Sequence, residues 1–246
     1  MGLLSWVKEK YQNIKEGIKT VLHDVKVKTV DAVNRLANRT KEWGGKVKEA
    51  INNAGTKIGI ILTPKRPYVP TEQEKKKADE CVSLINRTFR SGIKNTLMNQ
   101  PPEKRLETFQ EFTKRATQVL NLTNVKLELE NLGATTMGGL NPETNVFTLN
   151  AAMIACDNPE LMEEQVFTVI HELTHKRQFD AIKDYANGRP IDKYGYSKRQ
   201  IYEFAKNWKC YIQPRENYEW YRKQPLENAA YGFEDMVKAK YYGINF

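Results

Sequence analysis

The ten residues Val166-Phe-Thr-Val-Ile-His-Glu-Leu-Thr-His175 decide how the rest of the chain is interpreted. Apolar residues occupy most of this stretch, which predicts a largely buried helix. Asp157-Asn-Pro159 carries the signals of a helix start, and we expect the helix to run to about Phe179. Two histidines and a glutamate on a buried helix cost free energy unless a partner satisfies them.

The His171-Glu-x-x-His175 spacing predicts a metal site. Residues four apart lie on one face of a helix, so both imidazoles can bind the same ion. Glu172 sits beside them, where it can act as general base toward a metal-activated water. The chain has three histidines, and the third, His23, lies in a distant basic segment. The alternative is a surface helix that matches the motif by accident, and the apolar neighbours argue against it.

A carboxylate is the expected third ligand, because Gln178 and Ala181 occupy the positions where an extended motif would place Gly and His. Two histidines with one glutamate form a common catalytic zinc site. Glu227 is the best candidate, since it follows the helix-starting Pro225 and precedes an apolar segment. The alternative for Glu227 is a carboxylate that only stabilises a helix N-terminus. Weaker candidates are Asp180, Asp184, Asp192, Glu203, Glu216, Glu219, Glu234 and Asp235.

Three segments carry a resemblance to a known family: His171-Glu-Leu-Thr-His-Lys-Arg-Gln178, Gly139-Leu-Asn-Pro-Glu-Thr-Asn-Val-Phe-Thr-Leu-Asn150 and Gln224-Pro-Leu-Glu-Asn-Ala-Ala-Tyr231. Together they resemble the gluzincin metallopeptidases, and most of all small bacterial and phage-borne members. The resemblance covers about residues 100–240. It implies a zincin-like domain that hydrolyses peptide bonds, with Zn²⁺ held by His171, His175 and Glu227 and with Glu172 as general base.

The resemblance also implies where a substrate lies. Val146–Asn150 would be the edge strand of the sheet and would pair with an extended peptide. Val146, Thr148 and Asn150 are therefore the expected substrate-binding residues.

Two further residues have a functional and a structural interpretation. Tyr231 lies four residues after Glu227, on the same helix face, and we expect it to stabilise an oxyanion or contact the substrate; the alternative is a core tyrosine. Gln178 lies one turn beyond His175 and is a candidate support for that ligand; the alternative is a solvent-facing amide. Related sequences carry an acidic residue just after the ligand glutamate, whereas Asn228-Ala-Ala230 follow here, so the support of the histidines is not predicted.

The surrounding pattern predicts an α+β arrangement over residues 71–246. Thr71 and Glu74 form a capping box that predicts a helix over 71–98, and Pro101-Pro102 open another. Strands are expected at 125–129, 135–139 and 146–150, and further helices at 198–208 and 225–238. The expected domain is thus a small antiparallel sheet beside an active-site helix.

Residues 1–62 differ from this domain in composition. Their apolar residues recur every three or four positions among lysines, which predicts an amphipathic helical arm, and the prolines of 63–70 predict a linker. Residues 1–66 hold 14 Lys/Arg against 6 Asp/Glu, whereas the rest of the chain holds 25 against 24. A near-neutral domain with a basic arm is therefore expected. Three widely spaced cysteines do not form a disulfide framework and favour a reducing compartment.

The sequence of the arm at residues 1–62 is compatible with several kinds of binding partner. We expect a docking or delivery segment, for example one that loads a toxin or effector of bacterial or phage origin into a secretion or injection apparatus. An anionic membrane and packing against the domain are the alternatives. Nucleic acid is not expected, because acidic residues are interleaved and arginines are few. The segment lacks the features of a secretory signal peptide, so we expect synthesis in the cytoplasm and a non-classical export route or packaging.

Two other functional classes compete with a metallopeptidase acting on a peptide or protein substrate. The first is a catalytically silent, zinc-stabilised binding protein or structural component of a virion, which would unfold with chelators. The second is a membrane-active protein whose arm is the effector.

Overall fold

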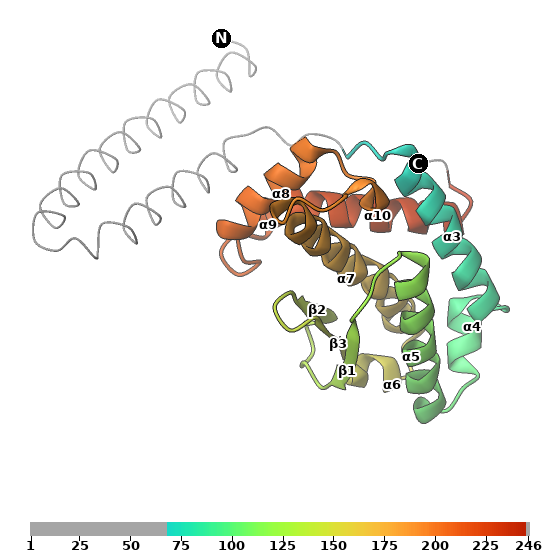
Figure 1. The fold of residues 1–246 in the computed structure, drawn as a ribbon. Coiled ribbons are helices and arrows are strands. Elements are labelled where there is room, and N and C mark those ends of the chain that lie inside the picture. The colour runs from blue at the N-terminus through green and yellow to red at the C-terminus, as the bar shows by residue number, and fades with distance from the viewer. Residues whose placement is uncertain (1–67, 245–246) are drawn as a thin grey trace, which may run out of the picture. The chain divides into compact units, whose positions relative to one another are not determined.

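The computed structural model describes residues 68–244, so the expected arm at 1–62 and most of the 63–70 linker lie outside the described residues. This part is mainly helical with one small sheet (Figure 1). Its elements are α3 (Glu72–Thr88), α4 (Ile93–Met98), α5 (Pro102–Val119), β1 (Lys126–Glu130), β2 (Gly138–Asn141), β3 (Val146–Asn150), α6 (Ala151–Ala155), α7 (Pro159–Ala186), the 3₁₀ turn η1 (Asp192–Tyr194), α8 (Lys198–Lys209), α9 (Tyr218–Lys223) and α10 (Pro225–Tyr241). Within residues 68–244, no helix is both long and apolar enough to cross a membrane.

The long helix α7 runs through the middle of this part of the chain (Figure 1). It begins where the sequence predicts: the Asn158 side chain accepts a hydrogen bond from the Leu161 N–H at 3.0 Å, and Pro159 follows it. Every residue from Gln165 to Gln178 is buried except Glu172. A helix buried on all sides is expected to lack a single apolar stripe, and α7 packs against neighbours along most of its length.

The sheet is mixed, which corrects the antiparallel sheet predicted from the sequence. Its strand order is β1-β3-β2, with β1 parallel and β2 antiparallel to the central β3. The chain leaves β1, crosses the end of β3 through residues 131–137, and returns as β2. Asn150 holds this crossing, because its side-chain amide donates to the carbonyls of Gly133 at 2.6 Å and Thr136 at 2.8 Å.

The expected helix over 71–98 is two helices. The Thr71–Glu74 capping box is present as predicted, but α3 ends at Thr88 and α4 begins at Ile93. Gly92, between them, has a φ of 87°, which a right-handed helix does not accommodate. The hydroxyl of Tyr241 then accepts a hydrogen bond from the Ile93 N–H at 3.2 Å, so the C-terminal end of α10 fixes the start of α4.

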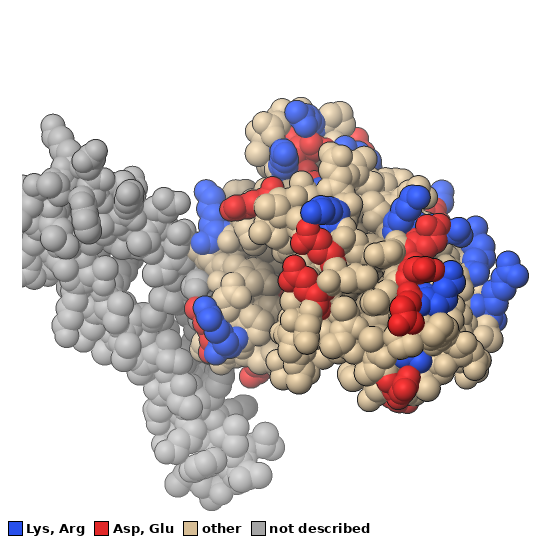
Figure 2. All heavy atoms as spheres, turned by 90° about the horizontal axis from the view of Figure 1, so that it is seen from below, with Lys and Arg blue, Asp and Glu red and all other residues tan. Residues whose placement is uncertain are grey.

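The main core fills the space between α7, its helical neighbours and the inner face of the sheet. Phe147 and Leu149 of β3 enter it from the sheet, and Phe109 and Phe112 enter it from α5. On the face seen in Figure 2, basic and acidic side chains of the described residues are interspersed, in keeping with the near-neutral balance expected outside the arm.

Candidate metal centre

Two histidines of α7 and one glutamate of α10 meet in the interior. His171, His175 and Glu227 each offer one ligand atom, and these three atoms lie within 4.8 Å of one another. The His171 and His175 Nε2 atoms are 3.1 Å apart, and Glu227 oxygens lie 3.4 Å from the first and 3.0 Å from the second. Tetrahedral zinc with bonds of about 2.0–2.1 Å separates its ligand atoms by about 3.3–3.4 Å. The spacing therefore suits a metal ion with His₂Glu ligation.

The hydrogen bonds on the outer ring nitrogens fix the histidine tautomers. His175 Nδ1 lies 2.9 Å from Gln178 Oε1, whose amide group donates to the Leu226 carbonyl at 3.0 Å. The amide oxygen must therefore accept, and His175 Nδ1 must donate. His171 Nδ1 lies 2.9 Å from Glu234 Oε2, and a carboxylate also accepts. In their neutral forms both rings thus turn an Nε2 lone pair toward Glu227.

Three electron-pair donors that face one another repel unless a cation lies among them. Glu227 is fully buried, and its Oε2 accepts no hydrogen bond from any described residue. The same carboxylates favour a proton on His171 when no metal is bound: burial lowers the pKa of His171, but the neighbouring Glu227 and Glu234 raise it to about 10. Burial raises the pKa of Glu227, and the two histidines lower it well below its ordinary value. The donor set and the orphaned oxygen both fit zinc.

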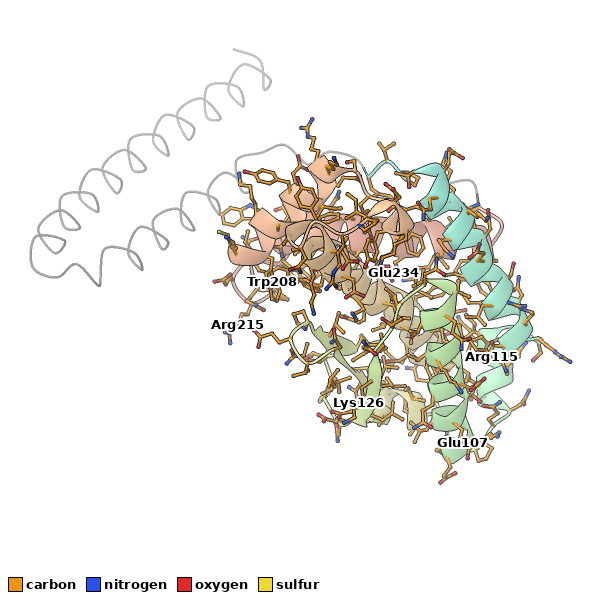
Figure 3. The ribbon with its side chains drawn as sticks, in the orientation of Figure 1. Glu107, Arg115, Lys126, Trp208, Arg215 and Glu234 are labelled. Atoms are coloured by element: carbon orange, nitrogen blue, oxygen red, sulfur yellow. The ribbon has the colours of Figure 1, made fainter. Side chains whose placement is uncertain are left out.

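A second set of contacts holds the ligands in place. The Tyr211 hydroxyl donates a short hydrogen bond to Glu227 Oε1, which leaves Oε2 as the open oxygen. Glu234 is held in turn by Lys238, whose Nζ lies 2.7 Å from Glu234 Oε1 and 2.8 Å from Glu164 at the surface. Glu234 is buried, and in the view of Figure 3 it is labelled near the middle of the described part, away from the peripheral Glu107 and Arg115 of α5. Such partners fix the orientation of metal ligands.

Glu172 and Tyr231 lie beside the ligands, as the sequence predicts. Glu172 follows His171 on α7 and is the one residue of the buried stretch that keeps partial exposure. Burial raises its pKa, although the two histidines lower it. Tyr231 is half-buried on α10, with its ring centroid 4.4 Å from that of His171. It is therefore placed at the site, and it is not a fully buried core tyrosine.

A buried hydrogen-bond network joins α8 to the start of α10. The side-chain oxygen of Gln224 accepts hydrogen bonds from Asn207 at 2.8 Å and from the Ile212 N–H at 2.9 Å, and its amide donates to the Ile212 carbonyl. Asn207 also accepts from the Leu226 N–H at 2.9 Å. Both amide side chains are completely buried. The segment that carries Tyr211 and the start of α10 is thereby fixed relative to α8.

The expected substrate-binding strand is the wrong one. β3, which contains Val146, Thr148 and Asn150, lies in the centre of the sheet and pairs on both sides, so it has no free edge for a peptide. Asn150 is also fully buried, and its side chain caps α6 and holds the 131–137 crossing. The prediction failed because it assumed the strand order, which the crossing over β3 determines.

Sequence reasoning also missed Glu234 and Tyr211 as supports of the ligands. Glu234 was considered only as a weaker ligand candidate, although it lies seven residues after Glu227 and therefore on the same face of α10, two turns away. That spacing is a usable signal. Tyr211 lies in the segment between α8 and α9, and nothing in its local sequence indicates a contact with Glu227.

Comparison with protein-family models, with curated proteins and with solved structures finds no match for this chain. The function therefore has to be inferred from the chemistry of the site itself.

Proposed function

We propose that this chain is a zinc-dependent metallopeptidase with a zincin-like domain. The observation that carries the proposal is the convergence of His171 Nε2, His175 Nε2 and Glu227 at 3.0–3.4 Å, with Glu172 beside them on α7. Support also comes from the hydrogen bonds that Glu234 and Gln178 make to the outer nitrogens of the two histidines. A His₂Glu set with an adjacent carboxylate is the donor pattern of hydrolytic zinc sites.

When bound there, zinc polarises a carbonyl and lowers the pKa of a water toward ~7. The chain itself supplies the proton transfers. Glu172 accepts a proton during attack and returns it to the leaving amine. Burial raises the pKa of Glu172, which favours its holding the proton between the two steps. Tyr231, with its ring against His171, donates a hydrogen bond to the oxyanion that forms.

In this proposal the substrate peptide pairs with the free edge of β2, and not with β3 as the sequence predicts. β2 is an edge strand, and it packs close to α7: a Cβ at Gly138 would lie 3.2 Å from the Thr168 side chain, three residues before His171. The next residue, Gly139, has open space, since a Cβ there would meet nothing within 4 Å. An extended peptide that adds to this edge is brought toward the middle of α7, where His171 and His175 lie.

The test uses full-length protein loaded with one equivalent of zinc and fluorescein-labelled casein as an unstructured substrate. Wild type should release labelled peptides, and Glu172→Gln should lose at least about a hundredfold of that rate while it keeps its zinc. Equal rates for wild type and Glu172→Gln would refute the mechanism.

A second outcome would change the class of protein. If the chain binds zinc at this site and chelation unfolds it, yet neither casein nor a library of proteome-derived peptides is cleaved, the silent zinc-stabilised protein is the better description.

A further inference from the structure

The guanidinium of Arg222 lies close to the cluster of His171, His175 and Glu227. The guanidinium carbon of Arg222 lies 3.6 Å from the centroid of the Tyr231 ring, and that centroid is 4.4 Å from the centroid of His171. The two distances together limit the separation of Arg222 from the His171 ring to 8.0 Å. An extended peptide rises about 3.3 Å per residue, so Arg222 is within two or three residues of a peptide bond at the ligands.

The position of Arg222 is fixed by its surroundings. It is half-buried on α9, two residues before Gln224, which is fully buried and hydrogen-bonded to Asn207 and Ile212. Stacking on Tyr231 occupies one face of the guanidinium, and its edge has the Tyr218 hydroxyl as a hydrogen-bond partner and Asp235 as a nearby negative charge. A guanidinium has five N–H donors, so donors remain for a further partner. A fixed planar fork of donors is the arrangement that binds a carboxylate through two hydrogen bonds.

Several neighbouring cations are held in ion pairs or hydrogen bonds. The contacts of Arg222 within residues 68–244 are instead the Tyr231 ring, the Tyr218 hydroxyl and the charge of Asp235. The engaged cations on α7 and α10 include Lys176 with Asp180, Arg177 with the Tyr194 carbonyl, and Lys238 with Glu234 and Glu164. The site itself carries three carboxylates, Glu172, Glu227 and Glu234. A negatively charged substrate group therefore needs a local cation, and Arg222 is the cation that stacks on Tyr231, beside His171.

We propose that Arg222 is a specificity-determining residue that selects substrates with a carboxylate close to the bond that is cut. The inference rests on the proposed peptidase function. The carboxylate comes either from an Asp or Glu side chain or from the C-terminus of the substrate. In both cases the two-pronged hydrogen bond to Arg222 holds the peptide beside Tyr231 and the metal ligands.

The experiment profiles cleavage of a proteome-derived peptide library by mass spectrometry, with zinc-loaded full-length protein. Arg222→Gln and Arg222→Glu are compared with wild type and with Lys223→Gln, a matched control on the next residue of α9 whose ammonium pairs with Glu219. Zinc content and the thermal unfolding midpoint verify that each variant is folded. In a separate binding assay, zinc-loaded Glu172→Gln is titrated with two peptide hydroxamates that differ only by Glu against Gln next to the chelating group.

Wild type and Lys223→Gln should enrich Asp, Glu or a chain terminus within three positions of the cut by about tenfold, and Arg222→Gln should lose this enrichment. Arg222→Glu should prefer Lys or Arg instead. Cuts next to Asp or Glu inside long peptides would show that the recognised carboxylate is a side chain. Cuts confined to the last residues of each peptide would show that it is the C-terminal carboxylate. The Glu hydroxamate should bind about tenfold more tightly than the Gln hydroxamate. This difference should disappear when Arg222 is replaced. Cleavage with one and the same profile in wild type and Arg222→Glu overturns the inference, whereas zinc binding without any cleavage overturns the peptidase function itself.

Discussion

Glu234→Gln is the substitution whose effect follows most directly from the geometry. Glutamine keeps the shape and an acceptor oxygen but removes the charge that lies 2.9 Å from His171 Nδ1. Loss of such a partner lowers metal affinity by about 10- to 100-fold, which corresponds to about 1.4–2.7 kcal/mol. The dissociation constant for zinc should rise by this factor in a competition titration against a fluorescent chelator.

The size of the effect should depend on pH. Burial lowers the pKa of His171 and its carboxylate partners raise it to about 10, so in metal-free wild type a proton competes with zinc at neutral pH. Glu234→Gln lowers the affinity of His171 for the proton, and it also lowers the affinity of the site for zinc. The loss in affinity should therefore be larger at pH 9, where proton competition is weaker, than at pH 6.

Glu164→Gln is the matched control for this experiment. Glu164 pairs with the same Lys238 at 2.8 Å but lies one step further from the metal ligands, and it has no contact with His171. Its zinc affinity should stay within about twofold of wild type, as for an exposed ion pair. Equal zinc affinities of Glu234→Gln and wild type at both pH values would refute the role given to Glu234.

Three further predictions follow from single contacts. Tyr211→Phe removes the hydrogen bond to Glu227 Oε1 and should weaken zinc binding about tenfold in the same titration. Gly232→Ala places a Cβ 2.2 Å from the Tyr68 ring, and this overpacking should lower the free energy of unfolding by about 1–3 kcal/mol in urea titrations. Because zinc displaces the proton of His171, apparent zinc affinity should rise about tenfold per unit between pH 6 and 8, and buffers that differ in protonation enthalpy should report proton release by calorimetry.

The sequence predicts which residues meet in the interior, because the constraints on them are local. The spacing of His171 and His175 follows from the helical repeat, and the apolar residues before them mark a buried helix. The Pro225 that precedes Glu227 and the apolar residues that follow it favour Glu227 as the third residue, and it lies at the two histidines. The end of α7 was missed, although Asn187-Gly188 is a usable stop signal, because the apolar pattern weakens after Phe179.

The parts that failed depend on contacts between distant segments. Whether β1 runs parallel to β3 is decided by the crossing that Asn150 holds, and alternation of apolar residues does not contain this information. The contact of Tyr211 with Glu227 likewise exists only because Gln224 fixes the segment between α8 and α10.

Zinc content by mass spectrometry tests the central claim most directly, on purified wild type, His175→Ala, Glu227→Ala and His23→Ala. We predict one zinc per chain in wild type and in His23→Ala, the histidine in the N-terminal segment, and almost none in the other two. Zinc retained by Glu227→Ala would move the third ligand elsewhere. A wild-type chain that takes up no zinc even after reconstitution would contradict the metal site and the function built on it.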